Sequence, residues 1–319
     1  MTDLTATSAA LQRIRETIAA RVLGQEEVID QILAAFIARG HVLLEGVPGT
    51  AKTLLVRVLA GALDIRFGRV QFTPDLMPSD VAGVSVYQES SRAFEFRPGP
   101  IFTDLLLADE INRAPAKTQS ALLEAMQERQ VTVDGVTHSL GELFSVFATQ
   151  NPVEYEGTYP LPEAQLDRFL VNVRIDYPSR NAELAMLAKY SEGFDAERAS
   201  TFMPTAVVTR NEVLQLRAMT DNVNVTVEVR EYIADIVRAT REDTSLTLGA
   251  SPRAAVALFR IARAAALVAG RDFATPDDVK QHALPVLRHR VLLAPELQVE
   301  GRSADDVISA ILARVPAPQ

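Results

Sequence analysis

The sequence predicts an α/β fold in two parts, a core with a parallel sheet between helices and an all-helical second domain. Three observations predict this. Short apolar segments alternate with helical patterns early in the chain, one such segment runs into a glycine-containing loop, and helical patterns dominate after residue 178. With 319 residues, the chain has room for roughly two domains. We place the core at residues 1–178 and the helical domain at residues 179–319.

Helices and strands alternate in the core. Residues 8–22 have apolar side chains at helical spacing, and a second helix is expected over residues 26–39, before Gly40. Strands are expected at residues 41–45, 68–72, 104–108, 143–149 and 170–175. The third and fourth of these are apolar at most positions, which is typical of strands that are buried on both faces of a parallel sheet.

Two hairpins are expected in addition to this sheet. Asp134-Gly135 interrupts the alternating residues of 131–138, and this dipeptide is the strongest short signal for a tight hairpin. Residues 84–96 give a weaker hairpin pattern with a longer connection. Such hairpins either decorate the sheet or contact a substrate, and the sequence leaves both open.

The second domain shows only helical patterns. They are expected at residues 181–191, 210–219, 227–241, 252–269, 276–290 and 303–314, with a linker at 192–208. Thr275 before Pro276 has the pattern of a helix start, and Ser303 with Asp306 resembles a capping box. Pro285 is expected to kink its helix or to end it early.

Composition narrows the functional classes. A formal net charge of −9 disfavours nonspecific binding to nucleic acid. We expect no signal peptide and no membrane insertion, because no apolar run approaches the ~18 residues of a membrane span. The chain has no cysteine, which excludes disulfides and thiolate metal sites and is compatible with a cytoplasmic location. The four histidines lack the spacing of a zinc site.

The glycine-containing loop predicts a phosphate site. It consists of Gly46, Val47, Pro48, Gly49, Thr50, Ala51, Lys52 and Thr53, between a strand and a helix. Backbone N–H groups and a helix N-terminus form a concave anion site in such a P-loop. Lys52 would contact the β- and γ-phosphates, and the Thr53 hydroxyl would ligate Mg²⁺. Ala51 stands where glycine is usual, and its methyl group restricts the backbone and crowds the phosphates.

An acidic pair follows the third strand. Asp109 would hold Mg²⁺ through its water shell, and Glu110 would act as the general base toward the attacking water. An Asp-Glu pair after an apolar segment more often caps a helix or faces solvent. Its position some 55 residues after a P-loop favours the catalytic interpretation.

Three further polar residues are candidates for roles around the phosphates. Asn151 follows the fourth strand and could orient the water, or it could simply begin a turn with Pro152. Arg168 could be an arginine finger or an ion-pair partner of Asp167. Arg253 opens a helix of the second domain and would reach back over the nucleotide, or it is a solvated surface arginine.

In this combination and order the residues resemble the AAA+ ATPases, and more closely the MoxR family. The resemblance covers nearly the whole chain. It rests on residues 22–25, 46–53, 94–102, 109–114, 148–152, 162–169 and 249–253. The alanine that stands in place of glycine at position 51 is itself similar to that family's own variant of the loop.

The resemblance implies a P-loop core with a helical lid, ATP and Mg²⁺ as cofactors, and a role for each candidate residue. Lys52 and Thr53 would be Walker A residues, Asp109 and Glu110 Walker B, Asn151 sensor 1, Arg168 the trans arginine finger, Arg253 sensor 2, and Gly24 and Gln25 neighbours of the adenine. Residues 84–96 would be the helix-2 insert and 131–138 the hairpin before sensor 1.

The resemblance also implies partners. Members of this group form rings, often hexamers, and act as chaperone-like machines on partner complexes. Their partners commonly carry a von Willebrand factor A domain with a metal-ion-dependent adhesion site. The position of Arg168 supports a homo-oligomer independently, because this residue follows the strand that ends in Asn151 and lies away from the loop that would cradle its own phosphates. A finger there would serve a neighbouring subunit.

The leading hypothesis is therefore an ATP-hydrolysing, ring-forming remodeller of protein substrates. A magnesium-chelatase-type motor subunit is the nearest alternative, since it shares the helix-2 insert. A nucleotide-gated scaffold with little turnover is another class, and the intact Asp109-Glu110 pair argues against it. A DNA-remodelling AAA+ protein fits poorly with the acidic charge. A small-molecule P-loop kinase would leave Asn151, Arg168 and Arg253 without a paired role.

Overall fold

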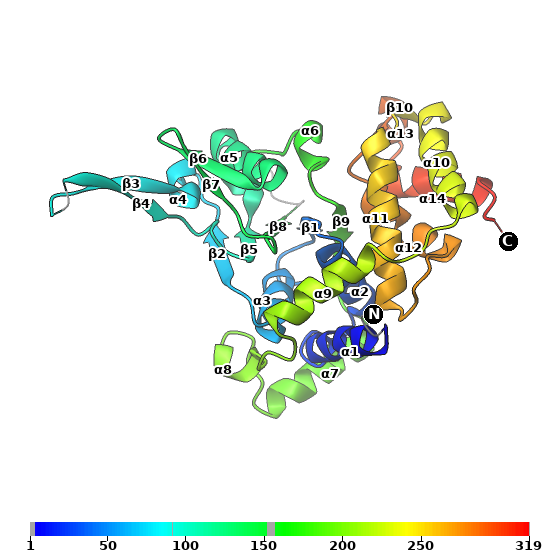
Figure 1. Ribbon diagram of the computed structural model, residues 1–319. Helices are drawn as coiled ribbons and strands as arrows, with labels where there is room; N and C mark the ends of the chain where they lie inside the picture. Colours follow the sequence, from blue (N-terminus) through cyan, green and yellow to red (C-terminus); the bar gives the residue numbers. More distant parts are fainter. Residues whose placement is uncertain (1–3, 91, 152–156, 319) are drawn as a thin grey trace.

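The computed structural model describes residues 4–90, 92–151 and 157–318 (Figure 1). Its centre is a five-stranded sheet with the strand order β2-β5-β8-β1-β9, in which all neighbours are parallel. The strands are β1 (Val42–Glu45), β2 (Phe67–Gln71), β5 (Leu105–Asp109), β8 (Ser145–Gln150) and β9 (Val171–Arg174). The predicted parallel sheet is confirmed, and each strand lies within two residues of its expected bounds.

Both faces of the sheet are buried at its inner strands β5, β8 and β1. Leu105 and Leu107 of β5 belong to one apolar cluster, and Leu106 and Ala108 belong to the other. The first cluster packs under α1 (Leu4–Ala19), α2 (Glu26–Ile37) and α3 (Lys52–Ala62), and the second under α4 (Pro78–Ala82) and α5 (Ala116–Glu128). Successive strand residues point to opposite faces, so burial on both sides requires the near-continuous apolar segments seen in the sequence.

The strand register aligns the carboxyl ends of the strands at one edge. Glu45 of β1 pairs with Gln150 of β8, and Gln71 of β2 pairs with Asp109 of β5. The residues that follow these strands therefore meet at this edge, which is where open parallel sheets bind their ligands. The P-loop and Asn151 follow strands of this set, and the acidic pair lies at the end of β5.

The two predicted hairpins are confirmed. The first pairs β3 (Gly83–Gln88) with β4 (Ala93–Pro98) and projects from the core in Figure 1. The second pairs β6 (Gln130–Val133) with β7 (Val136–Ser139). Its turn residues Asp134 and Gly135 have φ of 50° and 80°, as a two-residue turn with matching twist requires. The hairpins touch where His138 stacks on Phe96, with 3.9 Å between ring centroids.

The second part of the chain is helical, as predicted. Its helices are α7 (Arg180–Ser191), α8 (Ala199–Phe202), α9 (Arg210–Thr220), α10 (Val227–Glu242), α11 (Pro252–Val268), α12 (Pro276–Leu287), α13 (Pro295–Val299) and α14 (Ala304–Arg314). It also holds one short antiparallel pair, β10 (Leu246–Leu248) with β11 (Leu292–Leu293), so the expectation of helices alone was incomplete. Strands of two and three residues are too short to show a two-residue hydrophobic period.

Helix ends follow the capping patterns. The capping boxes of Thr275 with Asp278 and of Ser303 with Asp306 are present, which confirms both predicted helix starts. Pro285 lies inside α12, and that helix ends at Leu287, three residues before its expected end. Two more short helices, η1 (Ile111–Arg113) and α6 (Glu163–Leu166), and α8 in the expected linker have too few residues for a helical period to show.

The two parts share one apolar core. Ile29 and Ile32 of α2 belong to the same cluster as Leu258 and Ile261 of α11. Figure 1 shows α10 to α14 beside the sheet on the β9 side, whereas α7 and α8 lie near α1. The boundary at residue 178 stays a prediction, because this common core does not divide there. Among the described residues, no helix is long and apolar enough to cross a membrane.

Candidate nucleotide site

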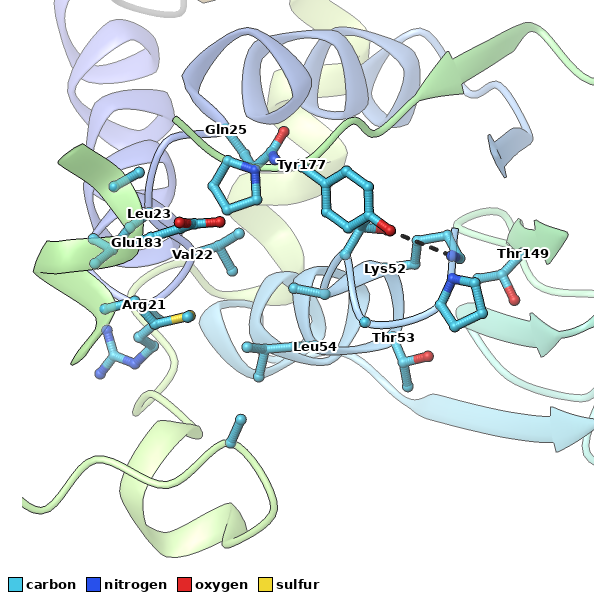
Figure 2. A pocket seen from close by; sticks show the side chains of 18 of the residues that line it. Arg21, Val22, Leu23, Gln25, Lys52, Thr53, Leu54, Thr149, Tyr177 and Glu183 are labelled. Atoms are coloured by element: carbon cyan, nitrogen blue, oxygen red, sulfur yellow. Dashed lines mark hydrogen bonds between the residues drawn. The ribbon is translucent and has the colours of Figure 1, made fainter. Parts of the chain in front are cut away.

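A cavity of about 830 Å³ opens at the carboxyl edge of the sheet (Figure 2). It is lined by the P-loop, the connection between α1 and α2, the ends of β2, β5 and β8, and one side of α7. One end is polar and the other apolar, and the volume lies in the range of small-molecule sites. The predicted residues that line it are Gln25, Pro48, Gly49, Thr50, Ala51, Lys52, Thr53, Asp109, Glu110 and Asn151.

The P-loop is closed around the side chain of its lysine. Lys52 Nζ donates hydrogen bonds to the carbonyl oxygens of Gly46 and Val47, at 2.6 and 2.7 Å. Gly46 is required by space, because a Cβ there would lie 2.5 Å from the carbonyl oxygen of Ile175. Gly46 and Val47 thus support the lysine from behind rather than lining the cavity. The ammonium group is placed at the N-terminus of α3, where an anion is favoured.

Ala51 adopts the conformation that glycine favours. Its φ of 63° and ψ of 20° lie in the left-handed region, directly before the first residue of α3. An L-residue is strained there by roughly 1–2 kcal/mol. The methyl group of Ala51 therefore does not change the path of the loop. The backbone adopts the left-handed conformation in spite of the strain.

Asp109 ends β5 as a nearly buried carboxylate, with 7% of its side chain exposed. Its Oδ1 accepts a hydrogen bond of 2.6 Å from the hydroxyl of Thr149, and Thr53 Oγ1 donates to it at 3.1–3.2 Å. Arg69 of β2 donates to its Oδ2 through Nη2 and Nε, at 2.8 and 3.2 Å. The hydroxyl and the carboxylate that the sequence assigns to Mg²⁺ are thus adjacent.

Glu110 is aimed into the cavity by its backbone and by two side chains. Its φ of 55° and ψ of 50° turn the chain sharply after β5, and its N–H donates to Thr149 Oγ1 at 2.8 Å. Its Oε2 accepts a hydrogen bond of 2.6 Å from Gln71 and lies 3.3 Å from Nη1 of Arg113. A carboxylate held in this way is oriented and partly solvent-accessible, as a general base requires.

Asn151 lies beside the P-loop. It directly follows β8, whose last residue Gln150 pairs with Glu45 just before Gly46. Its side chain is buried at the cavity wall, and its carbonyl oxygen is 3.5 Å from Nδ2 of Asn112. Pro152, which the sequence pattern paired with it, lies outside the described residues.

The apolar end of the cavity is formed by Val22, Leu23 and α7. Figure 2 shows the ring of Tyr177 between Gln25 and Lys52 in this view. Gln25 lines this end, and its Nε2 donates to the carbonyl oxygen of Asp176 at 3.1 Å. Gly24 has a φ of 70°, and a Cβ there would lie 2.5 Å from Cβ of Ala182. It is not a lining residue, and its role is to let α7 approach the α1–α2 connection.

The structure separates two predicted residues from this cavity. Arg168 and Arg253 are not among its lining residues. Asp167 and Arg168 precede β9, whose first residue Val171 pairs with Val42 at the amino edge of the sheet, whereas the P-loop follows the carboxyl edge. Nη1 of Arg253 lies 3.6 Å from the carboxylate of Asp167, so both arginines belong to that opposite edge.

The structure places the Arg253 side chain beside Asp167 and not over this chain's own P-loop. Its side chain is 71% exposed, and α11 is fixed against α2 and α12 rather than over the P-loop. Asp167 also forms an ion pair with Arg290, whose Nε lies 2.7 Å from Oδ1 of Asp167. This second ion pair fixes the carboxylate that Arg253 contacts.

Sequence reasoning missed Arg69, Gln71 and Thr149 as members of the site. Thr149 stands just before the predicted Gln150-Asn151, and its hydroxyl bridges Asp109 and the Glu110 backbone. Arg69 and Gln71 alternate on a strand, which places them on one face. Their role depends on β2 lying next to β5, and sheet order is not visible in the hydrophobic pattern.

Comparisons with known proteins show the family of the chain. The profile of the ATPase family associated with various cellular activities (AAA) matches residues 41–171, and the profile of the AAA lid domain matches residues 238–311. Chaperone MoxR1 of Mycobacterium tuberculosis is 42% identical over 307 residues, which cover 93% of this chain and 80% of that protein. The chain belongs to the MoxR family of AAA ATPases.

Other relatives match over most of the chain. The uncharacterised protein YeaC of Bacillus subtilis is 49% identical, over 93% of this chain and 91% of its own. Protein MoxR of Paracoccus denitrificans is 31% identical, with 93% of each chain covered. A crystal structure of a candidate ATPase from Cytophaga hutchinsonii has a TM-score of 0.89 and 40% identity, and covers 99% of this chain and 97% of that one.

Proposed function

We propose that this MoxR-family protein binds ATP with Mg²⁺ in the cavity and hydrolyses it in a ring, where a neighbouring subunit completes each site. The observation that carries the proposal is the convergence of Lys52, Thr53, Asp109 and Glu110 at the polar end of one cavity. A phosphate cradle, a metal-holding pair and a base are the parts that phosphoryl transfer to water needs.

The residues fit a nucleotide with its metal ion. Mg²⁺ prefers oxygen ligands and keeps several waters, and the Thr53 hydroxyl and the Asp109 carboxylate lie 3.1–3.2 Å apart at the cavity wall. Bound Mg²⁺ would neutralise charge on the phosphates. Lys52 adds a cation on the other side, and the apolar end near Val22, with Gln25 and Gly24 behind it, suits an adenine ring.

Glu110 would take the proton of the attacking water. Gln71 and Arg113 orient its carboxylate, and the Thr149 hydroxyl fixes its backbone. Asn151 stands between this carboxylate and the P-loop and would hold the water or sense the γ-phosphate. These roles follow from position, because each side chain reaches the same polar end of the cavity.

The arginines would act between subunits. Arg253 contacts the carboxylate of Asp167, and Arg168 is the next residue in the sequence after Asp167. Both arginines lie at the amino ends of the strands, away from their own P-loop. Packed against the open cavity of the next copy, this edge would bring Arg168 to its γ-phosphate, and Arg253 would follow the same interface. Hydrolysis would then require assembly, most simply as a hexameric ring.

The cellular role that we propose is chaperone-like remodelling of a partner complex, with a von Willebrand factor A domain protein as the partner. One relative of this chain is itself named a chaperone. The β3–β4 hairpin projects from the core and exposes Tyr87 and Phe94, which pack edge to face with 5.4 Å between centroids. Exposed aromatic pairs are suited to contact with a protein.

Two variants test the proposed site. Lys52→Ala is expected to weaken ATP binding by at least about tenfold, because the loop loses its only side-chain cation. Glu110→Gln is expected to keep binding and to lose turnover by a factor on the order of 10² or more, because the amide cannot accept the proton. The measurements are ATP affinity by calorimetry and phosphate release.

Glu124→Gln is the matched control, since Glu124 is an exposed glutamate of α5 away from the cavity. It should leave both quantities unchanged. Full turnover in Glu110→Gln would remove the proposed base. Tight binding without turnover in the wild type, at every protein concentration, would instead favour a nucleotide-gated scaffold.

A further inference from the structure

The carboxylate of Asp109 is fully engaged by donors. A carboxylate has about four acceptor positions. Thr149 donates to Oδ1, Arg69 donates twice to Oδ2, and Thr53 lies across both oxygens. Any metal-bound water that also binds Asp109 must therefore displace one of these donors.

Arg69 is the donor that can leave. Thr149 is 1% exposed on the central strand β8, and Thr53 belongs to the first turn of α3. Arg69, in contrast, lies on the edge strand β2, and 47% of its side chain is exposed. An arginine on an edge strand can swing into solvent by rotating its own side chain, without any movement of the backbone.

We propose that Arg69 is a positioning residue that competes with Mg²⁺ for Oδ2 of Asp109 and thereby sets the metal concentration at which the nucleotide binds. The inference rests on the proposed Mg²⁺–ATP site. Its basis is the two-point contact of the guanidinium with the carboxylate, at 2.8 and 3.2 Å, which is the strong form of such a pair. A metal ion whose bound water contacts the same oxygen would lie close to the guanidinium, and the two positive charges would repel each other.

The same guanidinium connects the metal-holding residue to the base. Nη2 of Arg69 also donates to Oε1 of Gln71 at 3.1 Å, and Nε2 of Gln71 donates to Glu110 at 2.6 Å. The contact from Arg69 fixes which end of the Gln71 amide faces Glu110. A bound Mg²⁺ that took the place of Arg69 would remove this contact, so the metal would act on the orientation of Glu110 through Gln71.

The test is a magnesium titration of nucleotide binding, which needs no hydrolysis. Adenylyl imidodiphosphate, a non-hydrolysable ATP analogue, is titrated into the protein by calorimetry at a series of free Mg²⁺ concentrations. Arg69→Gln should lower the Mg²⁺ midpoint by about tenfold, because it removes a neighbouring positive charge. Arg69→Lys keeps the charge but loses the two-point contact, and should lower it about threefold.

Arg66→Gln is the matched control. Arg66 stands just before β2 and forms the same kind of pair with Asp104, at 3.3 Å, at the other end of the strand pair. Asp104 keeps Arg210 as a partner in this variant, so the fold should survive and the midpoint should not move.

An unchanged or raised Mg²⁺ midpoint in Arg69→Gln, with an intact far-ultraviolet spectrum, would overturn the inference. If that variant does not fold, an unchanged midpoint in Arg69→Lys would do so. The proposed function fails in a different way, through wild-type protein that binds the analogue with no dependence on Mg²⁺, or not at all, and the inference about Arg69 would fail with it.

Discussion

At the scale of single residues, two residues of the site have strained backbone conformations. Ala51 and Glu110 are both left-handed, with φ of 63° and 55°, and they flank the position where the phosphates would lie. Strain of this kind is found where a function requires a sharp turn. The P-loop spacing could be predicted from the sequence because its residues are consecutive.

Replacing Ala51 by glycine should relieve this strain. Ala51→Gly is expected to raise the free energy of unfolding by about 0.5 kcal/mol, since about 1–2 kcal/mol of strain exceeds the added entropy of the unfolded chain. Ala310→Gly is the control, because Ala310 is exposed in the middle of α14. It should lower the free energy by about 1 kcal/mol. Equal losses in denaturant titrations of both variants would mean that Ala51 is unstrained.

The partners of Asp109 and Asp167 could not be predicted from the sequence. Arg69 and Asp109 are neighbours only because β2 lies beside β5, and Arg253 meets Asp167 only because α11 packs along the β9 side. Hydrophobic periods predict elements and faces, but they do not give the order of strands or the place of a helix around a sheet. The place of Arg253 beside Asp167 could not be predicted for this reason.

At the scale of elements, a buried histidine connects strand β8 of the sheet to helix α5, which packs on it. His41 stands before β1, accepts a hydrogen bond of 3.0 Å from the Val146 N–H at Nδ1, and contacts the carbonyl oxygen of Met126 through Nε2 at 3.1 Å. Burial lowers the pKa of His41 to about 3, with Arg129 adding to the effect. The ring is therefore neutral in the folded protein.

This histidine should make stability depend on pH. The unfolded state takes up a proton below about pH 6.5, whereas the folded state does so only near pH 3, so stability is lost as pH falls between these values. His41→Asn should reduce the slope of unfolding free energy by about 1 kcal/mol per pH unit between pH 6 and 5. Between pH 7.5 and 8.5 the two slopes should agree. An unchanged slope at low pH in denaturant titrations would show that His41 is not the titrating group.

At the scale of the whole molecule, the two halves of the proposed active site lie on opposite edges of one sheet. The P-loop and Glu110 follow the carboxyl edge, and Arg168 precedes β9 at the amino edge. A single copy cannot bring its own Arg168 to its own cavity without dismantling the sheet. Two copies in a head-to-tail arrangement can, and such contacts close into rings when the rotation allows.

Mixing two inactive variants tests this account most directly. Glu110→Gln subunits lack the base but keep Arg168, and Arg168→Ala subunits lack the finger but keep Glu110. Each variant alone should lose most ATP turnover while it still binds ATP. Mixed in equal amounts, they form interfaces with one intact base and one intact arginine. We predict that phosphate release then rises well above the sum of the separate activities, and that it rises further with total protein concentration. A mixture no more active than that sum, or full turnover by Arg168→Ala alone, would contradict a site that is completed by a neighbouring subunit.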